Sequence, residues 1–325
     1  MLGVLKRVKR AVRACLQKFV LRREADKAFR HDRDQFMYGA GALHLDRKAA
    51  ARAEIVMGYH VLEKGLTMPN RRMGFGKGAL IHLMHLVTSF ESRFGDDPQV
   101  RHAVGVLRAY RELHSDWPDP MPRLDAFLAA HADVPAAHEP HVKREDFYAA
   151  KNAPFPEFAA SRHVVRHFAG PVPQETIEAA VAIAATAPSA CNRQHARVHV
   201  VKDRSAMEKI LELQGGTRGF GTDADKLLLI TSDLSCVRWS WERHDCYVNG
   251  GVFAMNLSYA LHWHGVAHCL MHWSVSPETD VKAHKLLGIP RNEAIVMCMA
   301  CGMPPEEFDV ASSPRLSASD VLTWH

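Results

Sequence analysis

Two arginines four positions apart, Arg162 and Arg166, are the clearest candidates for binding an anion. With His163 they lie in the segment S-R-H-V-V-R-H-F. The four-residue spacing places both guanidinium groups on one face of a helical turn, or of the irregular turn that begins a helix. The forked guanidinium group matches a phosphate in shape and charge. The segment is therefore predicted either to hold a phosphate or to form an ordinary solvated basic face.

A second group of polar side chains follows an apolar helix expected at residues 175–187. Pro188 ends that helix, and Ser189, Asn192 and Gln194 then place hydrogen-bond donors and acceptors on a short turn. A rigid turn of this kind suits a heterocycle that has carbonyl and imide edges. The same residue types are common in a plain connection between a helix and a strand, so both interpretations stay open.

Hydrophobic periodicity indicates the elements that must position these two groups. Residues 1–115 form a predicted helical domain, because apolar residues recur every three or four positions with few β-branched runs. Residues 116–157 are rich in proline and are predicted to be a linker with one short helix near 123–131. The helices expected in the first domain cover residues 24–36, 47–64, 78–94 and 98–114.

The remaining residues, 158–325, mix helical and strand patterns in one domain. Helices are expected at 175–187, 205–213, 248–264 and 279–287. Strands are expected at 197–202, 226–232, 268–273 and 294–301. This order predicts an α+β fold, since it contains too few βαβ units for a doubly wound sheet.

Several short motifs in this second domain resemble the nitroreductase family of FMN-dependent oxidoreductases. S-R-H-x-x-R-x-F is followed by P-V-P-x-E-x-I and then by A-P-S-x-x-N-x-Q. Later come R-G-F-G at 218–221, G-G-V-F-A-M-N-L at 250–257, G-V-A-H-C at 265–269, and G-M-P at 302–304. The resemblance implies a mostly antiparallel sheet flanked by helices, with an extra all-α domain before it.

The resemblance also implies a cofactor and the residues that bind it. Arg162, His163, Arg166 and Arg315 match positions that hold the FMN phosphate and ribityl chain. Pro188, Ser189, Asn192 and Gln194 match the loop beside the isoalloxazine ring, and the backbone of Cys269 and Leu270 matches the segment that faces flavin N5 and O4. No side chain is expected to be a catalytic acid, base or nucleophile.

The implied activity is electron transfer from NAD(P)H, the co-substrate, to an electron-poor small molecule such as a nitro compound, quinone or enone. Members of the family are usually homodimers with FMN at the subunit interface. Three positions depart from the family pattern: Val164 replaces a common serine, His195 replaces a common proline, and the lysine often found before Arg315 is missing. The alternative is a flavin-binding or scaffold protein whose helical N-terminal domain carries the function.

Composition limits the class of protein. The 325 residues are 47% hydrophobic and 24% charged, which excludes disordered and collagen-like chains. No run of about 18 apolar residues occurs, so no membrane-spanning helix is predicted. The seven cysteines are odd in number and scattered, which favours reduced thiols and a cytoplasmic location.

The first 23 residues form a basic arm with an apolar stripe. Residues 1–35 hold eleven lysines and arginines against four acids, in a chain of formal net charge +5. Such a helix either packs on the protein's own body or lies on an anionic membrane surface, which would place the protein at the inner face of a membrane. Nucleic acid is not expected as a partner, because no aromatic residues are interleaved with the basic ones.

Three further patterns contain residue types that could take part in chemistry. The histidines between 262 and 272 cross a predicted helix end and strand, so no metal site is expected. Cys298 and Cys301 lie on a predicted strand, where this spacing sends the two side chains to opposite faces. The loop at 63–76, with Arg71, Arg72 and Phe75 between glycines, is predicted either to cover the active site or simply to connect two helices.

Overall fold

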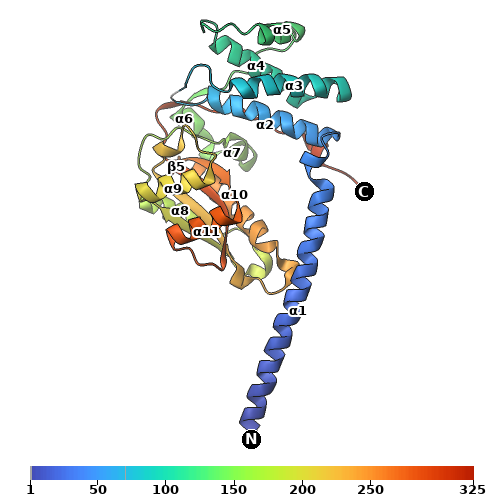
Figure 1. The fold of residues 1–325 in the computed structure, drawn as a ribbon. Helices are drawn as coiled ribbons and strands as arrows, with labels where there is room; N and C mark the ends of the chain where they lie inside the picture. Colours follow the sequence, from blue (N-terminus) through green and yellow to red (C-terminus); the bar gives the residue numbers. More distant parts are fainter. Residues whose placement is uncertain (1, 70) are drawn as a thin grey trace.

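The computed structural model describes residues 2–69 and 71–325 and shows a helical N-terminal part beside an α+β part (Figure 1). A single long helix, α1, leads into a layer of four further helices, and the chain then builds the sheet. The helices of the N-terminal part are α1 (Leu2–Gly39), α2 (Lys48–Leu66), α3 (Lys77–Phe94), α4 (Pro98–Leu113) and α5 (Pro122–Ala130). The helices expected from the apolar spacing are all present.

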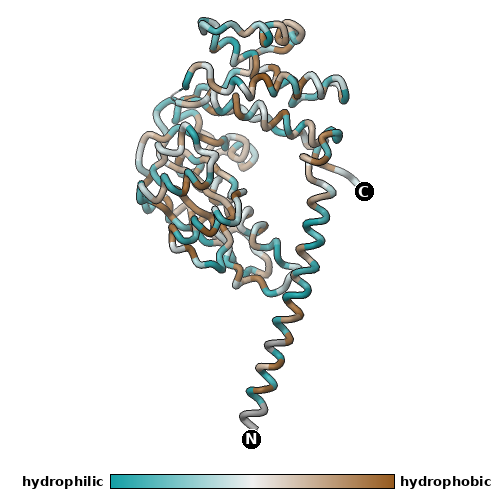
Figure 2. The backbone as a smooth tube through the Cα atoms, in the orientation of Figure 1, coloured by the Kyte–Doolittle hydropathy of each residue, from teal (hydrophilic) through white to brown (hydrophobic). Residues whose placement is uncertain are grey.

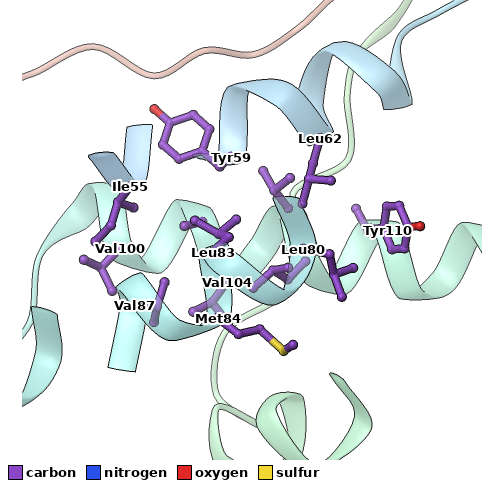
Figure 3. Close-up of a cluster of buried hydrophobic side chains, with 14 of the residues drawn as sticks. Ile55, Tyr59, Leu62, Leu80, Leu83, Met84, Val87, Val100, Val104 and Tyr110 are labelled. Carbon is purple, nitrogen blue, oxygen red and sulfur yellow. The ribbon is translucent and has the colours of Figure 1, made fainter. Parts of the chain in front are cut away.

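Helices α2 to α5 share one hydrophobic core (Figure 3). Ile55 and Leu62 of α2 meet Leu83 of α3 and Val104 of α4, and all four are 0–1% exposed. The start of α4 is fixed locally, because the carboxylate of Asp97 accepts a hydrogen bond from the backbone N of Gln99. The helical part therefore has its own core, separate from the sheet.

A four-stranded antiparallel sheet, ordered β2-β3-β5-β4, forms the centre of the second part. Helices α8 and α10 pack on one face and α9 and α11 on the other, so the predicted α+β class is confirmed. The strands are β2 (Ala196–Val201), β3 (Lys226–Asp233), β4 (Ala267–His272) and β5 (Glu293–Gly302). The helices are α8 (Gln174–Ala184), α9 (Arg204–Gln214), α10 (Asp245–Trp263) and α11 (Pro277–Leu287).

Alternation along the strands divides the core into two layers. Leu227 and Leu229 of β3 belong to the cluster under α9 and α11, whereas Leu228 belongs to the cluster under α8 and α10. Cys298 and Cys301 of β5 fall into these two different clusters. The prediction that they lie on opposite faces is confirmed, and both thiols are buried in the core.

Residues 116–157, predicted as a proline-rich linker, contain structure that the sequence did not indicate. A short strand, β1 (His141–Lys143), pairs antiparallel with β6 (Glu307–Asp309) near the end of the chain. Two short helices follow, α6 (Arg144–Phe147) and α7 (Phe155–Ser161). The β1–β6 pair ties this segment to the C-terminal tail, which ends with the short helix α12 (Ala318–Val321).

Helix α1 projects away from the rest of the chain, with its N-terminal end at the tip (Figures 1 and 2). It touches the second part near Trp239 and Trp241, and Asp32 forms an ion pair with Arg243. Apolar side chains near its start, Val12, Leu16 and Phe19 among them, are more than half exposed. The arm is therefore only partly packed on the protein's own body. None of the helices in residues 2–69 and 71–325 has an apolar stretch long enough to cross a bilayer.

Candidate cofactor site

The segment after α7 is fixed against β4 and α10 rather than being a free helical turn. Arg162 caps the end of α7, and the backbone N of Val165 donates to the carbonyl of His268 at 3.1 Å. Just before it, Oγ of Ser161 lies 2.9 Å from Nε2 of His262 on α10. Residues 162–169 are neither helix nor strand, so the helical turn predicted through Arg166 is wrong, because the backbone of Val165 bonds to β4 instead of to the segment itself.

Arg166 is buried and Arg162 is partly buried, and neither has an anionic partner in the described part of the chain. Arg166 is 8% exposed, and Nε of Arg162 and Nε of Arg166 are both buried with no hydrogen-bond acceptor. No ion pair in the described part of the chain involves either arginine or Arg315. Desolvating a cation without a counter-charge is costly, so this arrangement fits residues that receive an anion from outside the chain.

Electrostatics indicate that Arg315 and His163 belong to the same group. Burial lowers the pKa of Arg162, and the charge of Arg315 lowers it further. Burial lowers the pKa of His163 as well, with Arg162 and then Arg315 adding repulsion. We call Arg162, His163, Arg166 and Arg315 the cationic cluster. Arg162 and Arg315 repel each other and both oppose a charge on His163, and a phosphate would relieve that repulsion. Arg166 is included because it lies in the same segment as Arg162.

The next stretch of β4 lies beside the cationic cluster. The thiol of Cys269 is 4% exposed, and burial raises its pKa although Arg166 nearby opposes this. Cys269 and Leu270 pair with Ala300 and Met299 of β5, so their backbone is held in the sheet. The guanidinium carbon of Arg166 also lies 5.8 Å from the ring centroid of Phe220. The predicted backbone segment is thus rigid and close to one of the predicted cations.

The second predicted group forms a strained loop. Asn192 and Gln194 have positive φ angles of 55° and 51°, as does Cys191 at 52°. These are unfavourable for residues other than glycine and are often found at binding sites. Oγ of Ser189 accepts a hydrogen bond from the backbone N of Gln194 at 2.9 Å and closes the loop.

A cavity of ≈ 140 Å³ lies against this loop. Pro188, Ser189 and Gln194 line it, together with His195 and Asn249. His195 is fully buried, and neither of its ring nitrogens has a hydrogen-bond partner. An unpaired polar group beside a small cavity indicates a place where a ligand could supply the missing bond.

Sequence reasoning missed the residue that anchors this loop, Arg193. Its Nη1 donates to the carboxylate of Glu242 at 2.9 Å and to the carbonyl of Cys236 at 2.8 Å, and its Nη2 donates to Asp245 at 3.1 Å. The hydrogen bond from Arg193 leads the causes that hold the pKa of Glu242 at about 2. The partners lie more than 40 positions away, so no local pattern could have revealed them.

The loop and the cationic cluster lie at opposite ends of α10 within one chain. The backbone N of Ala190 donates to Asn249 near the start of α10, whereas Ser161 meets His262 near its end. The two contacts are thirteen positions apart on the helix, which corresponds to about 20 Å along the helix axis. The structure therefore does not bring the two predicted groups together in a single copy.

The loop at 63–76 lies outside the cationic cluster for the most part. Phe75 packs inside the helical core, where its ring lies 5.1 Å from that of Tyr110, and a Cβ on Gly65 would come within 2.1 Å of it. Arg71 forms an ion pair with Asp309 at 2.8 Å. Phe75 is thus half-buried against the helical core, so its side chain packs there instead of covering a pocket, contrary to the lid interpretation.

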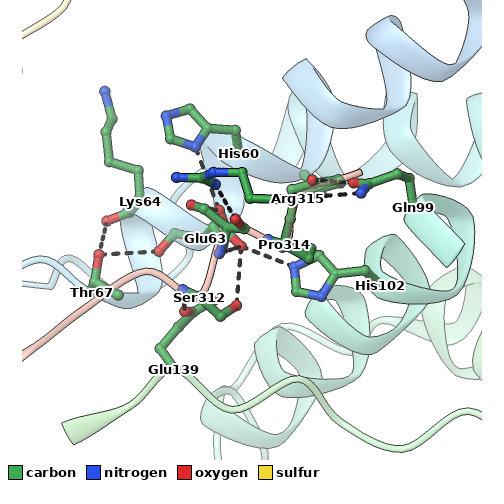
Figure 4. Close-up of polar contacts among 12 residues, drawn as sticks. His60, Glu63, Lys64, Thr67, Gln99, His102, Glu139, Ser312, Pro314 and Arg315 are labelled. Carbon is green, nitrogen blue, oxygen red and sulfur yellow. Dashed lines mark hydrogen bonds and ion pairs between the residues drawn. The ribbon is translucent and has the colours of Figure 1, made fainter. Parts of the chain in front are cut away.

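The end of α2, in contrast, lies beside the C-terminal tail (Figure 4). Glu63 is fully buried and accepts a hydrogen bond from Nε2 of His102 at 2.9 Å. Burial raises the pKa of Glu63, but hydrogen bonds, led by those from His102 and His60, outweigh this and hold the pKa well below its usual range. No signal in the sequence connected this glutamate with the tail, because its partners are far away along the chain.

The histidines between 262 and 272 were the candidates for binding a metal ion, and two of them are hydrogen-bonded inside the fold. Among the residues with described side chains, no three histidine, cysteine or acidic groups are arranged to hold an ion. His262 is bonded to Ser161, and Nε2 of His268 lies 2.7 Å from Oγ of Ser258. These histidines pack as part of the interior.

Comparison with known proteins adds a family-level result. Residues 159–229 match the model of the nitroreductase family. The NADPH:FMN oxidoreductase of Vibrio harveyi in complex with NAD+ is similar in structure, with 20% identity, a TM-score of 0.44, and coverage of 52% of this chain and 76% of that one. An FMN-dependent nitroreductase from Clostridium difficile R20291 is also similar in structure, with 18% identity and a TM-score of 0.41. That match covers 50% of this chain and 92% of the other one. No curated protein matches the chain. The matched segment, residues 159–229, carries Arg162, Arg166 and the Ser189–Gln194 loop, so these predicted site residues lie in the part of the chain that is similar to the nitroreductase family.

Proposed function

We propose that the protein is an FMN-dependent oxidoreductase that takes electrons from NAD(P)H. The observation that carries the proposal is the cationic cluster, in which Arg162 and Arg166 are desolvated and have no anion to pair with. A flavin phosphate has the charge and the number of acceptor oxygens that these donors lack. The family match at residues 159–229 supports the same cofactor.

The residues divide into those that would hold the phosphate and those that would hold the ring. Arg162 and Arg315 would bind the phosphate, because both can supply charge-assisted hydrogen bonds. Pro188, Ser189, Asn192 and Gln194 would lie along the ring, where the strained loop keeps their polar groups in fixed positions. The chemistry that FMN supplies when bound is hydride acceptance and onward electron transfer to an electron-poor acceptor, such as a nitro compound, quinone or enone.

The site that we propose needs two copies of the chain. We call the loop at residues 188–194 the ring loop. In one copy the ring loop and the segment that carries the cationic cluster contact α10 near opposite ends, about 20 Å apart along the axis. A homodimer in which the loop of one protomer faces the cationic cluster of its partner would join them. The proposal predicts two equivalent flavins for each dimer.

Absorbance spectroscopy of the purified protein tests the proposed function. We expect oxidised-flavin bands that bleach when NADPH or NADH is added without oxygen and return when an acceptor is added. Fluorescence titration with FMN would then give the affinity. A protein that remains colourless with added FMN, and whose melting temperature FMN does not raise, would instead favour the scaffold alternative.

A further inference from the structure

The first contact between the helical domain and the C-terminal tail is made by Glu63 of α2. Ser313 donates to its carboxylate twice, from the backbone N and from Oγ, each at 3.0 Å. Arg315 follows two residues later and donates to the carbonyl of Ser313. Because Glu63 is fully buried, it holds this part of the tail in one place, and with it the start of the Arg315 side chain.

The second contact is made by the next residue, Lys64. Its Nζ donates to the carbonyl of Gly216 at 3.4 Å, two residues before Arg218. Burial lowers the pKa of Lys64, and the charges of Arg166 and Arg218 lower it further. In the described part of the chain Lys64 has no carboxylate partner. A half-buried lysine thus lies among other cations.

The third contact is made by Thr67, one turn further along. Its carbonyl oxygen lies 2.5 Å from Nε2 of His167, the neighbour of Arg166 in the chain. Met68 then enters the core on one face of the sheet, where its sulfur would lie 3.3 Å from a Cβ at Gly219. Residues 63–68 therefore touch three separate segments, and each of these carries an arginine.

We propose that residues 63–67 of the helical domain are part of the anion site: Glu63 positions Arg315 through Ser313, and Lys64 contributes a further cation. This rests on the proposed FMN function, with the FMN phosphate as the anion. The extra domain would then be a working part of the cofactor site. It would set the distance between Arg315 on the tail and Arg166 beside β4.

Comparison of FMN with riboflavin tests the proposal, since riboflavin lacks only the phosphate. We expect Lys64→Met to raise the Kd for FMN about tenfold, as loss of one charge-assisted contact would, and to leave the Kd for riboflavin unchanged. Glu63→Gln and Ser313→Ala should have the same selective effect, about fivefold, because they loosen Arg315. Lys77→Met is the matched control, since Lys77 pairs with Asp119 on the surface of the helical domain.

Thermal stabilisation by inorganic phosphate provides a readout that does not require flavin. Phosphate should raise the melting temperature of the parent protein and of Lys77→Met, and raise it less for Lys64→Met. Equal loss of FMN and riboflavin binding, or variants that behave like Lys77→Met, would overturn the role of residues 63–67. Failure of the parent protein to bind FMN would refute the proposed function, while the phosphate result would still decide whether Lys64 belongs to an anion site.

Discussion

Glu139 accepts a hydrogen bond from the backbone N of Ser312 at 2.5 Å, while its other carboxyl oxygen is buried without a partner. Burial raises the pKa of Glu139 to about 7, with repulsion from Glu63 contributing and the Ser312 bond opposing. Two carboxyl groups of very different acidity thus hold neighbouring residues of the tail. We therefore expect the attachment of the tail to depend on pH.

The first prediction is that Glu139→Gln stabilises the protein at neutral pH. The folded chain keeps the Glu139 proton up to about pH 7, whereas the unfolded chain releases it near pH 4.5, so the parent loses stability as pH rises through this window. We expect the variant to be about 1–2 kcal/mol more stable at pH 7.5 and equal to the parent at pH 4. Urea unfolding at both pH values measures this, and a difference that does not vary with pH would contradict it.

The second prediction concerns Glu63, whose contribution to stability depends on pH in the opposite direction to that of Glu139. Its pKa is lowered in the folded state, so its contribution to stability is present above the unfolded pKa near 4.5 and is lost as pH falls below that value. Glu63→Gln should therefore cost stability at pH 7 and much less near pH 3. A denaturation series from pH 7 to pH 3 tests this. Glu112→Gln, a change at an exposed carboxylate, serves as the control.

The third prediction tests the phosphate contacts directly. Arg162→Ala and Arg315→Ala should each weaken FMN binding by roughly tenfold or more, since each removes a contact of about 1.5–3 kcal/mol. Fluorescence quenching of free FMN gives the affinity. Arg101→Ala, which removes an exposed ion pair with Asp133 in the helical domain, should leave it unchanged. Unaltered FMN affinity in both cluster variants would reject the assignment.

The fourth prediction concerns the basic arm. Residues 6–23 include many basic groups and exposed apolar side chains, which is typical of a helix that lies on an anionic membrane. A chain that begins at Ala25 should lose binding to vesicles containing anionic lipid and keep its flavin, because the ion pair between Asp32 and Arg243 is retained. Co-sedimentation with anionic and neutral vesicles measures this, and equal binding by the two chains would exclude a membrane role.

The fifth prediction concerns His195, which lines the cavity beside the Ser189–Gln194 loop. Its ring is fully buried and neither nitrogen is bonded, so replacing it with an apolar group of similar size should remove a desolvation cost. We expect His195→Leu to stabilise the flavin-free protein by about 1 kcal/mol. The same substitution should weaken flavin binding if the imidazole of His195 forms a hydrogen bond to the flavin in the cavity. A loss of stability would show that packing of the imidazole outweighs its unpaired nitrogens.

The amino-acid sequence by itself determined the local elements of this protein. Apolar spacing in α2 to α4 and the β-branched and leucine runs of β3 and β5 are strong periodic signals, because each element must bury one face or both. The motif around Arg162 and the turn from Pro188 to Gln194 were also visible locally. The spacing of Cys298 and Cys301 was sufficient to place them on opposite faces of the sheet.

Only the tertiary structure decided which of these pieces meet. Pairing of β1 with β6 joins segments more than 160 positions apart, and three-residue strands have too little pattern to be recognised alone. The same holds for Glu63 with Ser313, since neither residue carries a local signal for the other. Hydrogen bonds between distant segments form only when the helices and strands that carry them pack together. The distance between the ring loop and Arg162, and the contacts of α2 with the tail, could therefore be learned only from the folded chain.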